Sequence, residues 1–173
     1  MGDRSKIEWT DSTWSPVTGC TKVSAGCANC YAERYAKRGI GDFRDYSVPS
    51  TARLDIRSIP FSKIRLHSKR LEIPLHWRKP RRIFVCSMGD LFHEAVPDEF
   101  IDKVFDVTMR CPHHVFQILT KRAKRMCAWF RTDWPLSNVW LGVSCENQET
   151  ADERIPLLIP PFREQSTISC AKI

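Results

Sequence analysis

The chain has 173 residues, a hydrophobic share of 42%, a charged share of 27% and a formal net charge of +7. These values are typical of one globular domain, here residues 1–173. No apolar run approaches the roughly 18 residues that a membrane-spanning helix requires, so we expect no membrane contact. The first residues lack the apolar core of a secretion signal, and we therefore expect a cytoplasmic protein.

The first segment, residues 1–39, is predicted to hold a turn and a helix. Residues 9–16 are interpreted as an ordered turn, and a helix is predicted over residues 28–38. Tyr31 and Tyr35 share one face of that helix, and the glycine that follows residue 38 supplies its stop.

The second segment, residues 40–82, is predicted to be irregular and strongly basic. Three prolines limit regular elements as far as residue 80. Residues 51–82 contain ten basic and two acidic side chains, which gives this stretch a local charge of +8. Such a stretch could meet the phosphates of a nucleic acid, or it could be a solvated connection between elements. Both interpretations stay open.

The third segment, residues 83–159, alternates between buried strands and amphipathic helices. The predicted strands and helices alternate in the order 83–87, 97–110, 115–119, 122–130, 139–143 and 148–158, and a fourth strand starts at 167. The strand starts are 32, 24 and 28 residues apart. This spacing is typical of βα units, whose crossover helices force the strands to run parallel. The pattern therefore predicts an α/β fold with a parallel sheet.

Polar side chains follow the predicted strands at the point where each strand ends. Strand by strand, they are Ser87 and Asp90, Lys121 and Arg122, and Ser144 and Glu146. The carboxyl ends of parallel strands are where α/β sheets and barrels place their sites. Because core packing needs no such clusters at one edge, the pattern predicts a ligand site there.

Three of the eight cysteines are clustered. Cys20, Cys27 and Cys30 form a C-x6-C-x2-C pattern, and Gly19 and Gly26 each precede a cysteine. In a reducing compartment such a cluster indicates metal binding or catalysis, whereas scattered cysteines indicate core packing. Three thiolates on a cubane iron–sulfur cluster leave one iron without a protein ligand. An open iron can bind a cofactor or a substrate, and we favour this interpretation.

Three other interpretations of the cysteines stay open. A structural zinc ion would need a fourth ligand, which one of the five histidines could supply, although none has conventional finger spacing. A redox pair would involve Cys27 and Cys30 alone. Three unligated core cysteines would leave the two flanking glycines unexplained.

Several long motifs resemble those of a protein family common in phages and bacterial genomes. They are IEWTDSTWSPVTGC (7–20), GCANCYAER (26–34), SMGDLFH (87–93), QILTKR (117–122) and WLGVSCENQ (140–148). Members are identified as phage-type three-Cys-motif proteins with a domain of unknown function, and they are similar to radical S-adenosylmethionine enzymes. The resemblance covers about residues 4–158.

The resemblance implies a partial (βα)n, TIM-barrel-like domain with two cofactors and an unknown substrate. By similarity, Cys20, Cys27 and Cys30 ligate a [4Fe–4S] cluster whose open iron binds S-adenosyl-L-methionine. The side chains expected at that cofactor are Tyr31, Ser87, Asp90, Ser144 and Glu146. The serines and acids among them could instead cap helices, and Tyr31 could belong to the core. Lys121 and Arg122 could steady an anionic substrate or be solvated. No catalytic residue is assigned.

The chain departs from its relatives in two places. The cysteine spacing is x6-x2, whereas x3-x2 is the commonest pattern in radical enzymes. Relatives also continue into further βα units, whereas residues 160–173 stop abruptly. We therefore expect a truncated sheet with an exposed apolar edge, and the catalytic activity of this chain stays open.

Two partners and one competing function complete the expectations. The resemblance makes a separately encoded partner protein plausible, and nucleic acid is the substrate class to test first because of residues 51–82. The competing hypothesis is a non-catalytic, zinc-stabilised nucleic-acid-binding module that uses the same three cysteines.

Overall fold

The computed structural model describes residues 5, 7–39, 59–130, 137–158 and 169–172, the last four as backbone only. The strands are β1 (Ser12–Trp14), β2 (Val17–Thr18), β3 (Arg65–Leu66), β4 (Arg82–Val85), β5 (Val115–Thr120), β6 (Val139–Cys145) and β7 (Ser169–Lys172). The α-helices are α1 (Tyr31–Lys37), α2 (Asp98–Met109), α3 (Ala123–Trp129) and α4 (Gln148–Arg154). Short 3-10 helices span Ala25–Asn29, Ser68–Arg70 and Ile73–His76.

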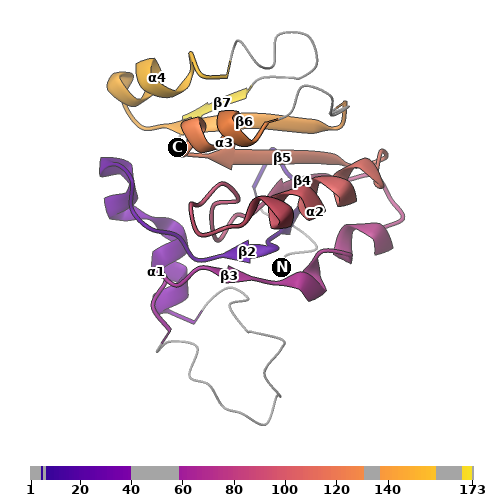
Figure 1. The fold of residues 1–173 in the computed structure, drawn as a ribbon. Coiled ribbons are helices and arrows are strands. Elements are labelled where there is room, and N and C mark those ends of the chain that lie inside the picture. The colour runs from indigo at the N-terminus through magenta and orange to yellow at the C-terminus, as the bar shows by residue number, and fades with distance from the viewer. Residues whose placement is uncertain (1–4, 6, 40–58, 131–136, 159–168, 173) are drawn as a thin grey trace.

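A five-stranded parallel sheet organises the chain, in the order β1-β4-β5-β6-β7 (Figure 1). The predicted α/β fold with parallel strands is therefore confirmed. Among the described strands, β1 and β7 each pair with one neighbour, so this sheet has two edges and no barrel closure. A separate antiparallel pair, β2 and β3, lies beside the sheet.

The predicted elements of the third segment are confirmed with small shifts of their ends. Strand β6 continues two residues further than expected, so Ser144 lies within the strand rather than after it. Helix α4 ends at Arg154, four residues before the predicted end at 158, because Pro156 cannot continue a helix. The fourth strand is present as β7, which pairs with β6 in parallel.

Two predictions for the first half of the chain are wrong. Residues 9–16 hold β1, which pairs with β4, and are not just a turn. Residues 65–76 hold β3 and two 3-10 helices, although this stretch was expected to be irregular. Residues 40–58, which belong to the same expectation, lie outside the described residues.

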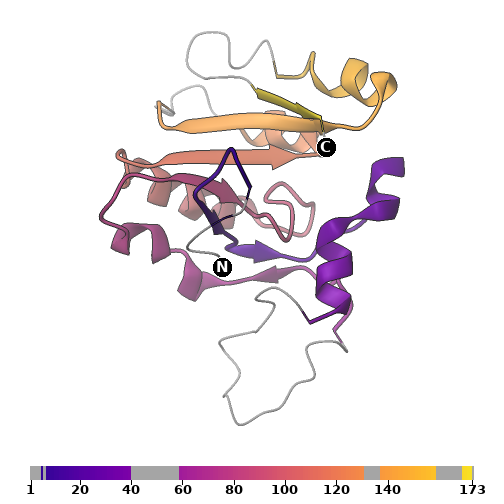
Figure 2. The same ribbon diagram turned by 180° about the vertical axis from the view of Figure 1, so that it is seen from behind.

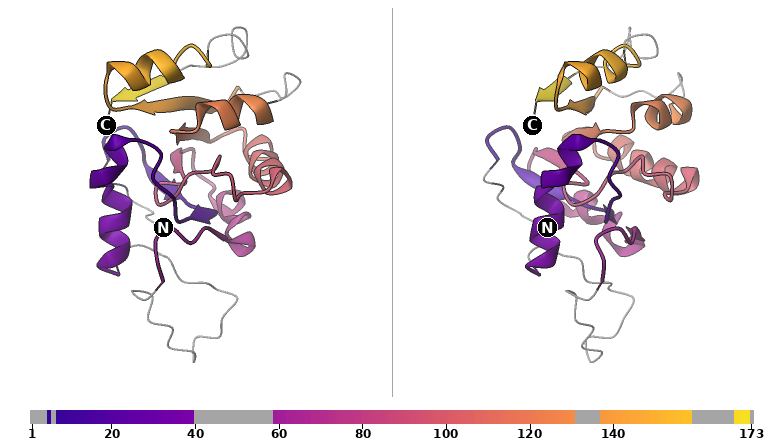
Figure 3. Two further views of the ribbon diagram at one scale, coloured as in Figure 1. Left: turned by 60° about the vertical axis from the view of Figure 1, so that its left-hand side comes forward. Right: turned by 90° about the vertical axis from the view of Figure 1, so that its left-hand side faces the viewer.

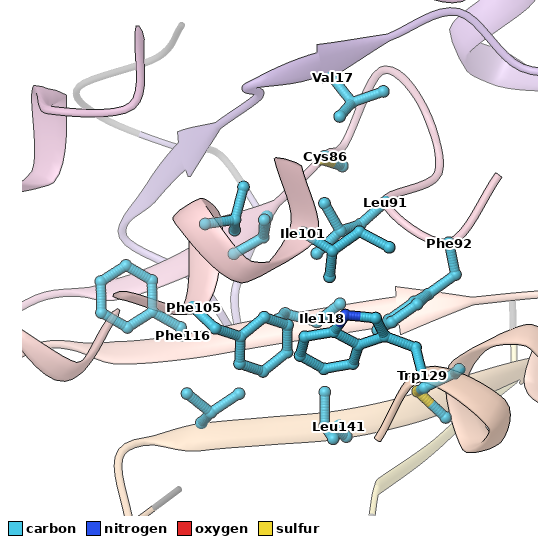
Figure 4. Packing of buried hydrophobic residues seen from close by; sticks show 14 of the residues in the cluster. Val17, Cys86, Leu91, Phe92, Ile101, Phe105, Phe116, Ile118, Trp129 and Leu141 are labelled. Carbon is cyan, nitrogen blue, oxygen red and sulfur yellow. The ribbon is translucent and has the colours of Figure 1, made fainter. Parts of the chain in front are cut away.

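The apolar core lies between the sheet and helices α2 and α3, which cover one face (Figure 2). The face of α2 that carries Phe100, Ile101, Val104 and Phe105 is buried. Figure 4 shows Trp129 of α3 against Phe105, with ring centroids 4.4 Å apart. Each such side chain contributes roughly 1.5–3 kcal/mol by leaving water. This core fixes the strand ends on which the site is built.

The segment that carries the cysteines crosses the carboxyl ends of the strands. It begins at Gly19, whose N–H donates to the Met88 carbonyl at 3.0 Å, and continues into α1, which stands beyond the sheet (Figure 3). Gly19 has φ +88°, and a Cβ there would lie 2.4 Å from the Lys63 carbonyl oxygen. Only glycine tolerates both the left-handed backbone and the close approach. We call residues 19–30 the cysteine loop.

Candidate functional site

Cys20, Cys27 and Cys30 line one cavity of about 450 Å³. Cys20 follows β2, Cys27 lies in the 3-10 helix Ala25–Asn29, and Cys30 precedes α1. The charged side chains of the cavity are Lys22, Glu33 and Lys37, and residues 59–62 form another part of its wall. The volume lies within the range of small-molecule sites, roughly 300–1,000 Å³.

The three thiols share this cavity without converging on one point. Among the residues that the structure describes, no group of three or more His, Cys, Asp or Glu side chains is close enough to hold a metal ion. The Cys20 Sγ donates to the Thr21 carbonyl at 3.4 Å, and the Cys27 Sγ lies 3.9 Å from the Ser24 hydroxyl. The donor set fits an iron–sulfur cluster in type and location, and binding would require the thiols to turn toward one another.

Arg122 connects the Cys20 side of the cysteine loop to the end of β5. Its guanidinium donates to the Cys20 Sγ at 3.5 Å and to the Thr21 carbonyl and hydroxyl at 3.2 and 3.0 Å. It also pairs with Asp90 at 3.2 Å and with Glu94 at 2.9 Å. Arg122 is only 6% exposed, so the alternative of a solvated side chain is wrong.

The thiols of Cys20 and Cys27 in the cysteine loop differ in acidity. Burial raises the pKa of Cys20 to about 11, Asp90 adds to this effect, and Arg122 opposes it. Burial also raises the pKa of Cys27, but hydrogen bonds from the Val23 and Ser24 backbone outweigh it, so its pKa lies below the usual value. Cys27 is therefore the more readily formed thiolate, the state in which a cysteine ligates a metal.

Glu146 connects the Cys27 side of the cysteine loop to the end of β6. Its carboxylate accepts hydrogen bonds from the Ser24 hydroxyl and, at 3.3 Å, from the Gly26 N–H. It also pairs with Lys121 at 3.3 Å and with Arg154 at 2.9 Å. Burial alone would raise the pKa of Glu146, but the Ser24 hydroxyl and Lys121 lower it to about 2. A Cβ on Gly26 would lie 2.9 Å from this carboxyl carbon, so any larger residue there would displace the Glu146 side chain.

Asp90 connects β4 to β5 and does not line the cysteine cavity. Its carboxylate accepts hydrogen bonds from the Phe92 N–H at 3.0 Å and the Thr120 hydroxyl at 2.8 Å. It also accepts from the Lys121 N–H at 3.3 Å and from Arg122 at 3.2 Å. These four bonds occupy both oxygens, so Asp90 holds Arg122 in place beneath Cys20.

Tyr31, Ser87 and Ser144 also lie outside the walls of the cavity. The Tyr31 hydroxyl donates to the Ser87 carbonyl at 2.5 Å, which joins α1 to the end of β4. Tyr31 is 37% exposed, so it is not a core residue. Ser144 is buried, and its carbonyl accepts a hydrogen bond from Arg154 at 2.6 Å.

The helix-capping alternative is wrong for the residues at the end of β6. Asn147 caps α4, and its carboxamide oxygen accepts from the Thr150 N–H at 2.9 Å in a capping box. Ser144 and Glu146 are thus not needed for the cap. Glu146 is free for its contacts with the cysteine loop.

Some site residues were not found from the sequence. Ser24 is one of them, because its hydroxyl links Cys27 to Glu146 and no sequence motif marks it. Glu33 and Lys37 form an ion pair at 2.9 Å on α1, and both also line the cavity. No signal in the sequence places residues 59–62 opposite the cysteines.

Part of the basic stretch 51–82 contacts other residues of the protein. Arg70 is buried and donates to the Ser15 carbonyl at 3.2 Å, and Arg81 donates to the Ser12 hydroxyl at 3.0 Å. Arg82 pairs with Asp11 at 3.1 Å. The stretch is therefore not simply a solvated connection where it is described, and its binding to nucleic acid stays a prediction.

Comparison with known proteins gives one match. A family model described as "Protein of unknown function (DUF5131)" matches residues 4–169. Neither the curated proteins nor the solved structures contain a match.

The described helices include none that is long and apolar enough to cross a membrane.

Proposed function

This chain belongs to the DUF5131 family of proteins of unknown function, and we propose that it is an iron–sulfur protein of the radical S-adenosylmethionine type with a partial TIM-barrel-like fold. One observation carries the proposal. The three cysteines of the C-x6-C-x2-C motif share one cavity at the carboxyl ends of a parallel sheet, where α/β folds hold their ligands.

In this proposal Cys20, Cys27 and Cys30 hold a [4Fe–4S] cluster, and S-adenosylmethionine binds beside it. When bound, the pair supplies one-electron and radical chemistry. The chain itself contributes position and charge. Arg122 fixes the loop at Cys20, and Glu146 fixes it near Cys27.

The predicted cofactor contacts need refinement in this arrangement. The carboxylates of Asp90 and Glu146 already bind protein groups, and the Tyr31 hydroxyl donates a hydrogen bond to the Ser87 carbonyl. These residues support the cysteine loop, so their direct contact with a cofactor stays a prediction. Lys22 and Lys37 in the cavity wall are better placed to meet an anionic part of a ligand.

A zinc-stabilised module is the second candidate, and Glu33 is the observation that favours it. None of the five histidines lines the described cavity, but the Glu33 carboxylate does. Zinc accepts carboxylate oxygen beside thiolates, and a structural site is closed by four protein ligands. The Lys37 ammonium, 2.9 Å from Glu33, competes for that carboxylate.

Metal content separates the two candidates. We expect anaerobic reconstitution to load about four iron and four sulfide ions per chain, with the broad visible absorbance of a cluster. Serine substitution of Cys20, Cys27 or Cys30 should abolish loading. Cys127→Ser is the matched control, because its Sγ donates to the Leu157 carbonyl at 2.8 Å and a hydroxyl can keep that bond.

Two outcomes would overturn the proposal. One is tight binding of a single zinc ion that survives attempted reconstitution, with loss of the metal in Glu33→Gln. The other is equal iron in the wild-type protein and the three serine variants. Formation of deoxyadenosine from S-adenosylmethionine in the presence of a reductant then tests the radical chemistry separately.

A further inference from the structure

One face of α1 is a strip of tyrosine and arginine side chains. At 100° per residue, Tyr31, Arg34, Tyr35 and Arg38 fall within an arc of about 100° on the helix. Arg38 follows the last residue of α1 with helical φ and ψ of −86° and −1°, so it continues the same face. We call these four residues the α1 face.

The rings on the α1 face are exposed to solvent and held in place. Tyr31 and Tyr35 are 37% and 43% exposed, and their rings pack edge to face with centroids 6.0 Å apart. The Tyr31 hydroxyl is bound to the Ser87 carbonyl, which fixes its ring relative to the sheet. Fixed, solvent-facing aromatic rings offer a stacking surface at little entropic cost.

The α1 face is cationic and has no acidic member. Arg34 and Arg38 are exposed, and within the described residues neither forms an ion pair. The one acid of the helix, Glu33, points to the cavity, where it pairs with Lys37. Guanidinium groups beside exposed aromatic rings are complementary to a polyanion that also carries planar groups able to stack.

We propose that the α1 face binds single-stranded nucleic acid and leads it to the cysteine cavity. This inference rests on the proposed function and names the substrate class of the same site. Unpaired bases stack on Tyr31 and Tyr35, while Arg34 and Arg38 meet the phosphates. A duplex would hide its bases from the rings, so the ligand is single-stranded.

The geometry favours this surface over the basic stretch 51–82. Arg70, Arg81 and Arg82 in that stretch already pair with protein groups. The α1 face belongs to the helix that forms one wall of the cavity, because Cys30 precedes α1 and Lys37 at its end lines the cavity. The cavity-lining side chains of the helix, Glu33 and Lys37, project from its other side. A strand bound to the α1 face therefore lies one helix diameter, roughly 10 Å, from the cavity, and it reaches the cavity by passing around α1 without crossing the sheet.

Fluorescence anisotropy with a labelled oligodeoxythymidine tests the proposal on the full chain. Tyr35→Ala should weaken binding by about 5- to 150-fold, the range for loss of one base stack. Arg34→Ala combined with Arg38→Ala should lower the slope of log affinity against log salt by about 1.4, for two phosphate contacts on a single strand. Circular dichroism checks that both exposed-site variants fold.

Two further variants locate the binding surface. Lys103→Ala combined with Arg110→Ala removes the same charge from exposed positions in α2 and at its C-cap, and it should leave binding unchanged. Arg78→Ala combined with Lys79→Ala tests exposed cations of the basic stretch and should have less effect than the α1 pair. Binding that is lost equally in the Arg78/Lys79 variant would overturn the assignment to α1.

The outcomes separate this inference from the proposed function. Absence of oligonucleotide binding, equal binding of a duplex of the same length, or full binding by Tyr35→Ala overturns the nucleic-acid assignment. Iron content, measured on the same preparations, should not change in Tyr35→Ala. Failure of wild-type protein to load iron instead overturns the proposed cluster, and the binding assay still decides whether α1 takes a single strand.

Discussion

Replacement of Arg122 by glutamine tests the contacts by which Arg122 holds the cysteine loop on the sheet. The side chain is buried, and its guanidinium contacts Asp90, Glu94, Cys20 and Thr21. Glutamine is shorter and neutral, so it cannot span these partners. The substitution leaves the Asp90 carboxylate without its cation.

The expected cost follows from the burial of each partner. Asp90 has a side chain only 7% exposed, and breaking a buried ion pair costs about 3–5 kcal/mol. Three remaining donors, the Phe92 N–H, the Thr120 hydroxyl and the Lys121 N–H, still solvate the carboxylate, so the lower end applies. The Glu94 side chain is 64% exposed, so loss of its ion pair with Arg122 adds at most about 1 kcal/mol to this cost. We expect a loss of about 3 kcal/mol.

Urea denaturation of the metal-free protein measures this loss as a change in the free energy of unfolding. In a thermal melt the midpoint should fall by roughly 6–12 °C. Arg125→Gln is the control, because the partner of Arg125, Asp98, has a side chain that is 50% exposed and the substitution should cost under about 1 kcal/mol. Equal losses in the two variants would refute the reasoning. So would full stability of Arg122→Gln.

Three smaller changes test other parts of the structure. The pKa of Glu146 is lowered to about 2 from a usual value of 4.5, so its carboxylate stabilises the fold above pH 4.5 and this contribution is lost as the pH falls toward 2. The difference in unfolding free energy between wild type and Glu146→Gln, at most about 3 kcal/mol, should therefore narrow between pH 5 and pH 2. If this difference did not change with pH, the charge of the Glu146 carboxylate would not be its cause. Gly19→Ala should lower the free energy of unfolding, measured by urea denaturation, by more than the roughly 1–3 kcal/mol that left-handed backbone strain alone costs. The reason is that the new Cβ would also clash with the Lys63 carbonyl. Unchanged stability would contradict the close approach. Asn147→Ala should cost about 1 kcal/mol by removing the cap of α4, and no change would show that the Thr150 hydroxyl alone suffices.

The polar residues at the strand ends could be predicted from the sequence only in part. The position of Asp90, Arg122 and Glu146 at strand ends was predicted because parallel strands finish at one edge. Their roles were not predicted, since the sequence does not show which polar groups pair with one another. Asp90 and Glu146 were expected to face a cofactor, and in the structure they hold Arg122 and the cysteine loop.

The sequence by itself determined the βα alternation from residue 83 onward and the grouping of three cysteines. Both are local: an apolar period marks each strand and helix, and short spacing keeps Cys20, Cys27 and Cys30 together. Only the tertiary structure decided that β1 joins the sheet and that the cysteine loop lies across the strand ends. A three-residue strand has no period of its own, and β1 forms because β4, about 70 residues later, supplies its hydrogen bonds.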